Sequence, residues 1–156
     1  MSAEIRIGYL VDHAEVLPIL VHWFVTWWPE YYGPDGPGDA RRDLAAYSGR
    51  DTLPIGVIAF SDGQLCGIAA LKPDSLDTHR HLTPWAAAGL VAPSFRRRGI
   101  GGTLLTELER IARRLGYPGL YCGTNTADSL LERNGWECFE QGLQRGQHVR
   151  IYRKTL

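Results

Sequence analysis

The chain has 156 residues, which is enough for one domain with a full hydrophobic core and too few for two. Seventeen basic and seventeen acidic side chains give a formal net charge of zero, so no overall field attracts nucleic acid or an anionic membrane. No apolar run reaches the length of a membrane span, and the N-terminus lacks the pattern of a signal peptide. We therefore expect one cytoplasmic domain over residues 1–156, with no nucleic acid or membrane as partner.

The three cysteines indicate reduced thiols and no metal site. Cys66, Cys122 and Cys138 are odd in number and far apart, and they lack a C-x-x-C pair or a histidine at zinc-ligand spacing. Cys66 and Cys122 lie within apolar runs, where free cysteine behaves as a small hydrophobic residue. A catalytic nucleophile at Cys122 is the alternative interpretation.

The first fifty residues predict a strand followed by two helices. Alternating apolar residues favour a strand over 5–9. A helix begins near Pro18 and ends before Pro29, because proline suits the first helical turn and breaks a helix interior. A second helix follows Asp39, a good N-cap, and runs to about Ser48. Seven acidic side chains and four arginines give this part of the chain a net charge of −3.

Residues 27–38 join these two helices and combine four aromatic side chains with a loop rich in proline and glycine. Aromatic side chains of this kind usually pack in the core. The alternative is that they form one wall of a ligand pocket, because loops on a rigid scaffold often carry binding residues. The sequence leaves both interpretations open.

The middle of the chain predicts a hairpin, a loop and a buried strand. The runs 53–60 and 64–71 are strand-like, and the Asp-Gly pair at 62–63 between them is typical of a hairpin turn. Residues 73–84 are polar and irregular, which predicts a surface loop. The apolar run 85–91 then predicts a strand that is buried on both faces.

A basic, glycine-rich turn follows this strand and leads into an amphipathic helix over 101–115. The free N–H groups and the positive dipole at the start of such a helix attract an anion. Glycines let a phosphate approach the backbone, and arginines add charge and forked donors. The residues fit neither a P-loop, which ends in Gly-Lys-Ser/Thr, nor the dinucleotide fingerprint. They predict a phosphate site made by Arg96, Arg97, Arg98, Gly99, Ile100, Gly101, Gly102 and Thr103.

The remaining residues predict a strand, a short helix and a terminal hairpin. The strand 120–124 is parallel to 85–91, because a helix separates the two. The helix covers 125–134, and 136–143 pairs with 148–154. The whole order is β-α-α-β-β-β-α-β-α-β-β. The fold class is α/β (α+β), a mixed sheet of about seven strands flanked by about four helices.

Two motifs give the chain a family resemblance. Arg96-Arg97-Arg98-Gly99-Ile100-Gly101, preceded by a strand that ends in Leu-Val-Ala-Pro, fits R-x-x-G-x-G. With these residues the chain resembles the GNAT superfamily of acyl-CoA-dependent N-acetyltransferases, whose pyrophosphate-binding signature is Q/R-x-x-G-x-G/A. Residues 125–136 look like the second GNAT signature, which is less specific. The resemblance implies the GNAT fold, acetyl-CoA as cosubstrate and no metal.

The resemblance also implies a reaction and a place for acetyl-CoA. Acetyl would move from acetyl-CoA to a primary amine of a small molecule or peptide, by direct attack in a ternary complex. The CoA phosphates would bind at 96–103, and backbone amides around Leu90 and Val91 would polarise the thioester carbonyl. Asn125 would contact the pantetheine arm of CoA; the alternative is that it only caps a helix.

The resemblance places the acceptor beside the segment that follows the first strand. This assigns substrate binding to Trp27, Glu30, Tyr31 and Tyr32. The net negative charge of residues 1–50 favours a cationic acceptor. For the general base the candidate is His81, because histidine titrates near neutrality, with His79 and Glu30 as alternatives. A homodimer is left open.

One departure from the family pattern puts catalysis in question. Alignment on Gly135-Trp136 places Leu131 where the family usually has a tyrosine that protonates the departing thiolate. Ser129, Tyr121 or solvent would then supply that proton. Because of this departure, the alternative function is a non-catalytic acyl-CoA-binding sensor or regulatory module.

Overall fold

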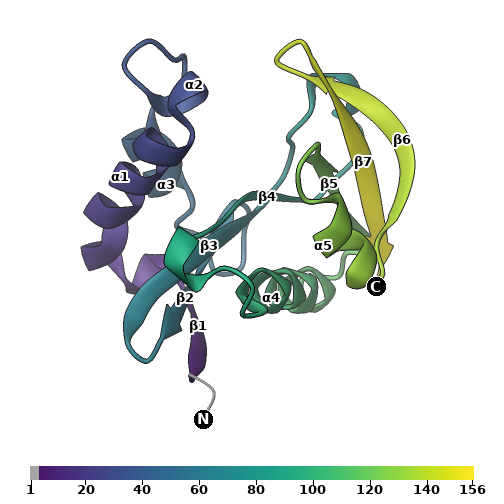
Figure 1. Cartoon of the computed structure of the whole chain (residues 1–156). Coiled ribbons are helices and arrows are strands. Elements are labelled where there is room, and N and C mark those ends of the chain that lie inside the picture. The colour runs from purple at the N-terminus through teal and green to yellow at the C-terminus, as the bar shows by residue number, and fades with distance from the viewer. Residues whose placement is uncertain (1–3) are drawn as a thin grey trace.

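A mixed sheet of seven strands runs through the computed structural model, which describes residues 4–156 (Figure 1). The spatial order of the strands is β1-β2-β3-β4-β5-β7-β6. Their bounds are β1 (Ile5–Tyr9), β2 (Ile55–Ser61), β3 (Gln64–Lys72), β4 (Trp85–Val91), β5 (Gly119–Thr124), β6 (Glu137–Gln144) and β7 (Gln147–Thr155). The predicted fold class and the predicted seven strands along the chain are confirmed.

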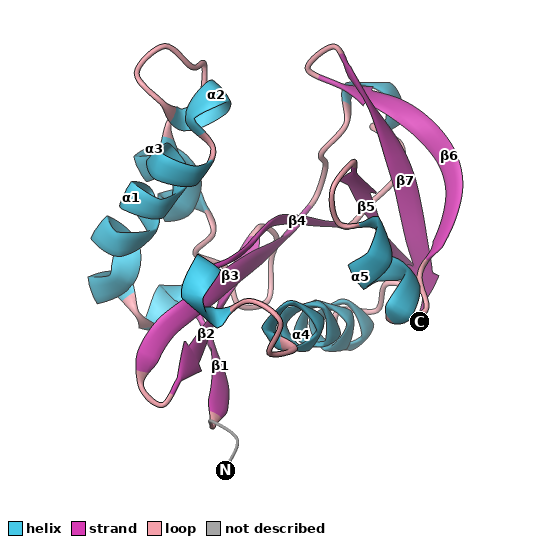
Figure 2. Ribbon diagram, viewed as in Figure 1, coloured by secondary structure: helices cyan, strands magenta, loops and turns pink. Residues whose placement is uncertain are grey.

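Helices lie on both faces of the sheet (Figure 2). Their bounds are α1 (Leu17–Trp27), α2 (Pro29–Tyr32), α3 (Ala40–Ala46), α4 (Ile100–Arg114) and α5 (Asp128–Arg133). The short α2 was not predicted; Pro29 ends α1 and also starts this new turn, because its fixed φ suits a first helical position. Asp39 caps α3 as expected and accepts a hydrogen bond from the Arg42 N–H at 3.1 Å. Over residues 4–156 no helix is long and apolar enough to cross a membrane.

Two hydrophobic cores hold these helices to the sheet. Leu20, Phe24 and Leu44 of α1 and α3 pack against Ile58 and Ile68 on one face. On the other face, α4 buries its apolar side against residues of β2, β3, β5 and β7, namely Val57, Ala59, Cys66, Leu71, Leu120 and Tyr152. Alternate residues of β2 and β3 thus enter opposite cores, which explains why their sequences are apolar without interruption.

Both hairpins turn through two residues with positive φ. Asp62 (φ 49°) and Gly63 (φ 84°) join β2 to β3, as the Asp-Gly signal predicts. Arg145 (φ 50°) and Gly146 (φ 78°) join β6 to β7. This geometry matches the twist of the strands and gives each hairpin a tight tip.

The sheet divides between its two parallel strands. β4 and β5 pair only at Trp85 and Tyr121, so the β4 edge from Ala86 to Val91 has no strand beside it there. Figure 1 shows the two strands diverging from this pair, with α1, α2 and α3 on one side and the β6–β7 hairpin on the other. We call the space between residues 86–91 and 122–124 the fork.

β4 is irregular where it borders the fork. The register with β3 shifts between Ile68 and Ala70, so Ala88 and Gly89 together oppose one residue, which is a β-bulge. Ala88 has a φ of 55°, an uncommon value for a residue with a side chain. Gly89 is exposed, and a Cβ atom built on it would meet no atom within 4 Å. The bulge therefore leaves open space along the unpaired edge.

Candidate functional site

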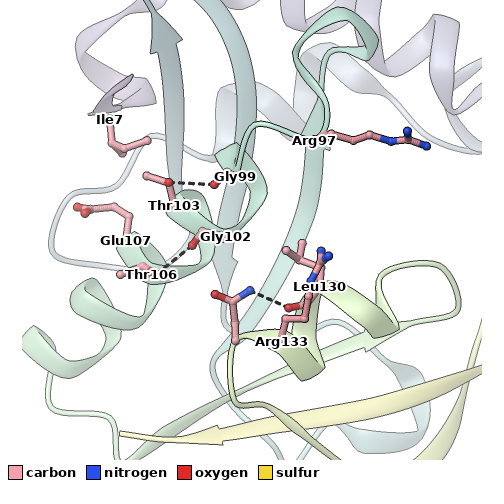
Figure 3. Close-up of a pocket in the computed structure, with 10 residues that line it drawn as sticks. Ile7, Arg97, Gly99, Gly102, Thr103, Thr106, Glu107, Leu130 and Arg133 are labelled. Carbon is pink, nitrogen blue, oxygen red and sulfur yellow. Dashed lines mark hydrogen bonds between the residues drawn. The ribbon is translucent and has the colours of Figure 1, made fainter. Parts of the chain in front are cut away.

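A hollow lies at the start of α4 (Figure 3). This groove has a volume of about 840 Å³ and is lined by Ile7, Arg97, Gly99, Gly102, Thr103, Thr106, Glu107, Leu130, Arg133 and Asn134. Four of the residues predicted to bind phosphate are among them. The groove runs between the first turns of α4 and the side of α5, so the sequence motif and the hollow coincide.

The first turn of α4 offers free donors to this groove. The first helical hydrogen bond runs from the Thr103 N–H to the Gly99 carbonyl at 3.0 Å. The N–H groups of residues 100–102 precede it and have no acceptor within the helix. Gly99 has a φ of 78°, a left-handed conformation that glycine adopts without strain. With 15 residues, α4 also has a developed dipole whose positive end points into the groove.

The three arginines of the turn have different surroundings. Arg97 lines the groove. Arg96 instead donates from Nε to the Val91 carbonyl at 3.2 Å, which fixes the turn to the end of β4. The Arg98 guanidinium lies 5.3 Å from the ring centre of Phe95. Arg97 is therefore the one of the three that lines the groove, and in Figure 3 its side chain extends away from the first turn of α4.

Two glycines of the turn, Gly101 and Gly102, also have different neighbours. A Cβ at Gly101 would lie 3.1 Å from Leu130 Cδ2, so this glycine allows α4 and α5 to approach each other. A Cβ at Gly102 would be 3.4 Å from Asn134 Oδ1, an ordinary contact. The sequence predicts that both glycines give room to a phosphate. At Gly101 the missing side chain also gives room to α5, and its role at a phosphate stays a prediction.

Leu131 does not face the groove. It is 1% exposed and packs in the core beside α4 with Trp136, whereas its neighbour Leu130 lines the groove. The expectation that position 131 points at the departing thiolate is therefore wrong for this leucine. A tyrosine placed there would enter a packed interior, because α5 turns that side toward α4.

Asn125 lies in the loop between β5 and α5 and is exposed. It does not cap α5, which begins at Asp128 after Ala127. Instead the Thr124 hydroxyl accepts hydrogen bonds from the N–H groups of residues 126 and 127, at 3.1 and 2.9 Å. The capping alternative is thus wrong. Asn125 borders a second hollow of about 260 Å³, together with Gln141, His148, Val149 and Arg150.

The two histidines before β4 differ in environment. His79 is buried; its Nε2 lies 3.0 Å from Glu140 Oε2, and its Nδ1 lies 2.7 Å from the Thr78 hydroxyl. His81 is exposed, and its ring stacks on that of His79 with centres 5.8 Å apart. Neither lines either hollow. His79 holds the 73–84 loop against β6, and a catalytic role of His81 stays a prediction.

Most aromatic side chains of residues 27–38 pack inward. Trp28 and Tyr32 lie against Phe24 of the core, with ring centres 4.8 and 5.1 Å away. Trp27 packs on Trp23 at 5.3 Å. The Tyr32 hydroxyl donates to Asp43 Oδ2 at 2.7 Å, and burial together with this bond raises its pKa far above the usual value. Glu30 is exposed.

Tyr31 is the exception among these aromatic residues. The guanidinium of Arg145, in the β6–β7 turn, lies over the Tyr31 ring at 4.1 Å from its centre. Sequence analysis missed Arg145, because nothing local in the chain indicates a contact between residues 114 positions apart. It also missed the bulge at Ala88 and Gly89, for which an interior glycine in a strand is the only available signal.

Cys122 is not an activated thiol. Burial, with a smaller effect of the Asp128 charge, raises the pKa of Cys122 to about 12. A nucleophilic cysteine requires the opposite shift, because the thiolate is the reactive form. Among residues 4–156 no three histidine, cysteine, aspartate or glutamate side chains are placed to hold a metal ion.

The family model of the GNAT acetyltransferases matches residues 17–136, which is more than half of the chain. The chain belongs to the GNAT acetyltransferase family. The match includes the bulged strand, the fork and every residue that lines the groove at α4 except Ile7. No curated protein matches the sequence significantly.

Solved structures of acetyltransferases share the fold. The ribosomal-protein-alanine N-acetyltransferase of Brucella melitensis is 25% identical and has a TM-score of 0.70, covering 98% of this chain and 99% of its own. The aminoglycoside 6'-N-acetyltransferase of Enterococcus faecium is 16% identical, with a TM-score of 0.75 and 96% of both chains covered. A Salmonella typhimurium acetyltransferase structure with its cofactor acetyl-CoA is 23% identical, has a TM-score of 0.69, and covers 99% of this chain and 94% of its own.

Proposed function

We propose that the protein transfers acetyl from acetyl-CoA to a primary amine. The observation that carries the proposal is the joining of two features of this GNAT chain: an anion-binding helix start and an unpaired strand edge. Arg96 links them directly, because it belongs to the turn and donates to the last residue of β4. A ligand with phosphates at one end and a reactive group at the other fits this arrangement.

The groove at α4 suits the phosphates of CoA. The N–H groups of residues 100–102, the helix dipole and Arg97 together provide donors and positive charge for a pyrophosphate. Glu107, farther along α4, and Leu130, beside Gly101, border the same groove. Acetyl-CoA supplies the activated acyl group, and the chain needs only to bind and orient it.

The edge of β4 suits the amide-rich arm and the thioester. The Ala92 N–H donates to the Cys66 carbonyl of β3 at 2.9 Å. Because N–H groups alternate between the two edges of a strand, the Leu90 N–H also faces β3, whereas that of Val91 faces the fork. We therefore assign the polarisation of the thioester carbonyl to the Val91 amide and not to that of Leu90. A donor fixed in the backbone costs no reorganisation as charge develops on the oxygen.

Transfer requires a neutral amine in the fork. The amine nitrogen attacks the thioester carbon, the carbon–sulfur bond breaks, and the products are an amide and the CoA thiol. The proton of the amine leaves through a base or a chain of water, for which His81 is the candidate from the sequence. The CoA thiolate is itself a fair leaving group, since thiols titrate near 8.5. Transfer without a tyrosine at position 131 is therefore chemically feasible.

The test is release of free CoA thiol from acetyl-CoA with a panel of primary amines. Transfer predicts a thiol and an acetylated amine in equal amounts, with the amide identified by mass spectrometry. A protein that binds acetyl-CoA in calorimetry but releases no thiol with any amine would instead be the sensor or regulatory module that the missing tyrosine suggests.

A further inference from the structure

The two sides of the fork touch again at their tips. Tyr31 belongs to α2, and Arg145 lies at the tip of the β6–β7 hairpin. The guanidinium carbon of Arg145 lies 4.1 Å from the centre of the Tyr31 ring, and this contact joins α2 to the β6–β7 hairpin. A guanidinium over an aromatic face at this distance is held by the ring quadrupole.

Arg145 is an unusual residue for its position. It occupies the first turn position with a φ of 50°, where hairpins of this type favour asparagine or glycine. It is exposed, and within residues 4–156 no carboxylate lies within 4.0 Å of its guanidinium. Local turn chemistry therefore does not account for an arginine here, whereas the Tyr31 ring does give its charge a partner.

The Tyr31 ring is held in place from behind. It packs edge-on against Tyr32 with ring centres 4.6 Å apart, and Asp43 fixes Tyr32 through the 2.7 Å hydrogen bond. The Tyr31 ring also fills the place of a side chain at Gly38, where a Cβ would lie 2.5 Å from Tyr31 Cε1. The aromatic face that Arg145 covers is thus presented by a fixed ring.

We propose that the Tyr31 ring is a cation subsite for the acceptor, and that Arg145 occupies it until a charged acceptor displaces the guanidinium. This rests on the proposed acetyl transfer to an amine in the fork. The amine that reacts must be neutral, so the charge on the ring belongs to a second group of the acceptor. The substrate class is therefore a primary amine that carries a further ammonium or guanidinium group.

Charge around the subsite agrees with this class. Glu30 precedes Tyr31 and is exposed, and residues 1–50 carry a net charge of −3. An acidic side of the fork attracts a dication and disfavours an acidic peptide. Displacement of Arg145 leaves its guanidinium in water at the hairpin tip, where solvation is complete and no buried charge is left unpaired.

The experiment compares two acceptors of similar length. Agmatine has a primary amine at one end and, at the other, the same guanidinium group as arginine. The matching amino alcohol has a neutral end. The readout is the ratio of their kcat/KM values, measured by CoA thiol release, together with calorimetry of agmatine binding to the CoA complex.

Four variants separate the subsite from a merely structural contact. Tyr31→Leu removes the ring and should lower the agmatine preference about fivefold; Tyr31→Phe keeps the ring and should lower it far less. Arg145→Asn removes the competing guanidinium with a residue that suits the turn, and should raise the agmatine preference about threefold. Arg153→Asn is the matched control, because Arg153 lies 4.7 Å over Phe139, away from Tyr31, and should change the ratio by less than twofold.

The double variant Tyr31→Leu with Arg145→Asn decides the mechanism. In the absence of the Tyr31 ring, removal of Arg145 should no longer change the agmatine preference, because the aromatic face for which the two guanidinium groups compete is gone. A lower agmatine preference in Arg145→Asn, or an equal change in kcat/KM for both acceptors, would mean that the contact only stabilises the fold, and the proposal would be wrong.

Failure here can be distinguished from failure of acetyl transfer. Turnover of the amino alcohol without any agmatine preference overturns the cation subsite and leaves the transfer reaction intact. Absence of thiol release with both amines contradicts the transfer reaction, and calorimetry then still tests the subsite. Agmatine binding that is equal in the parent, Tyr31→Leu and Arg145→Asn overturns it.

Discussion

The start of α4 and the tips of the fork are the two ends of the proposed site, and they are built in different ways. The first is contiguous: strand, turn and helix follow one another from Trp85 to Arg114. The second is assembled from Tyr31 and Arg145, which are distant in the chain and meet only in the folded structure. An end made of consecutive residues is therefore recognisable as a sequence motif, whereas an end made of distant residues is not.

The energetics of the two ends differ as well. Charge-assisted hydrogen bonds from a helix start and an arginine to phosphate are each worth about 1.5–3 kcal/mol. A solvent-exposed cation over a tyrosine is worth about 0.5–1 kcal/mol. Binding at α4 should thus be strong and general, whereas the fork tips should tune selectivity by small factors.

The largest effect is expected where the two ends meet. Gly89 borders the fork, its φ lies outside the left-handed region, and an added Cβ has no neighbour within 4 Å. Gly89→Val should therefore fold normally but project two methyl groups into the open space. Because a displacement of about 1 Å can cost a factor of about 100, acetyl transfer should fall at least that far.

The measurement is the rate of thiol release, with the urea midpoint as control for folding. A folded Gly89→Val protein with nearly the parent's rate would show that the thioester does not pass along this edge. That result would mean that the groove at α4 and the fork do not form one continuous site.

A smaller effect, on stability, tests the buried side of α5. Leu131 is 1% exposed, so Leu131→Tyr adds volume and a hydroxyl to a filled core. We expect the free energy of unfolding to fall by about 1–3 kcal/mol, measured by urea denaturation. Leu130→Tyr is the comparison, since that side chain is only partly buried and lines the groove. A stable Leu131→Tyr protein with faster transfer would mean that this face of α5 does reach the sulfur.

The smallest effect concerns Cys122, which lies on β5 beside the fork. Its raised pKa, about 12, leaves it protonated at neutral pH, and reactivity should increase only as the pH approaches that value. Alkylation at pH 8 should modify the exposed Cys138 first and leave Cys122 almost untouched, as mass spectrometry of peptides can measure. Acetyl transfer that is lost in step with Cys122 labelling would restore the nucleophile interpretation.

The sequence predicts what depends on neighbours along the chain. The strand-like runs of β2 and β3, the Asp-Gly turn and the Asp39 cap each have a local cause, and each is present in the structure. The turn at 96–103 is recognisable for the same reason. Its eight residues are consecutive, so composition and order already describe the site.

The remainder depends on packing between distant segments. Gly101 lies against the side of α5, and α5 turns Leu131 toward the core; neither contact follows from neighbours along the chain. Likewise, no pattern distinguishes Tyr31 from Tyr32. Tyr32 is fixed by Asp43 and Tyr31 is covered by Arg145, and both partners come from elsewhere in the chain.

CoA binding at the start of α4 is the most direct test of the proposed function. Calorimetry should compare CoA with pantetheine, which lacks the phosphates, in the parent, Arg97→Ala and Arg113→Ala. Arg113, an exposed arginine in the last turn of the same helix, gives the same change in charge away from the groove. We predict that Arg97→Ala weakens CoA about tenfold and leaves pantetheine unchanged, whereas Arg113→Ala alters neither by more than about twofold. Equal CoA affinity in all three proteins would contradict the phosphate site and, with it, the proposed function.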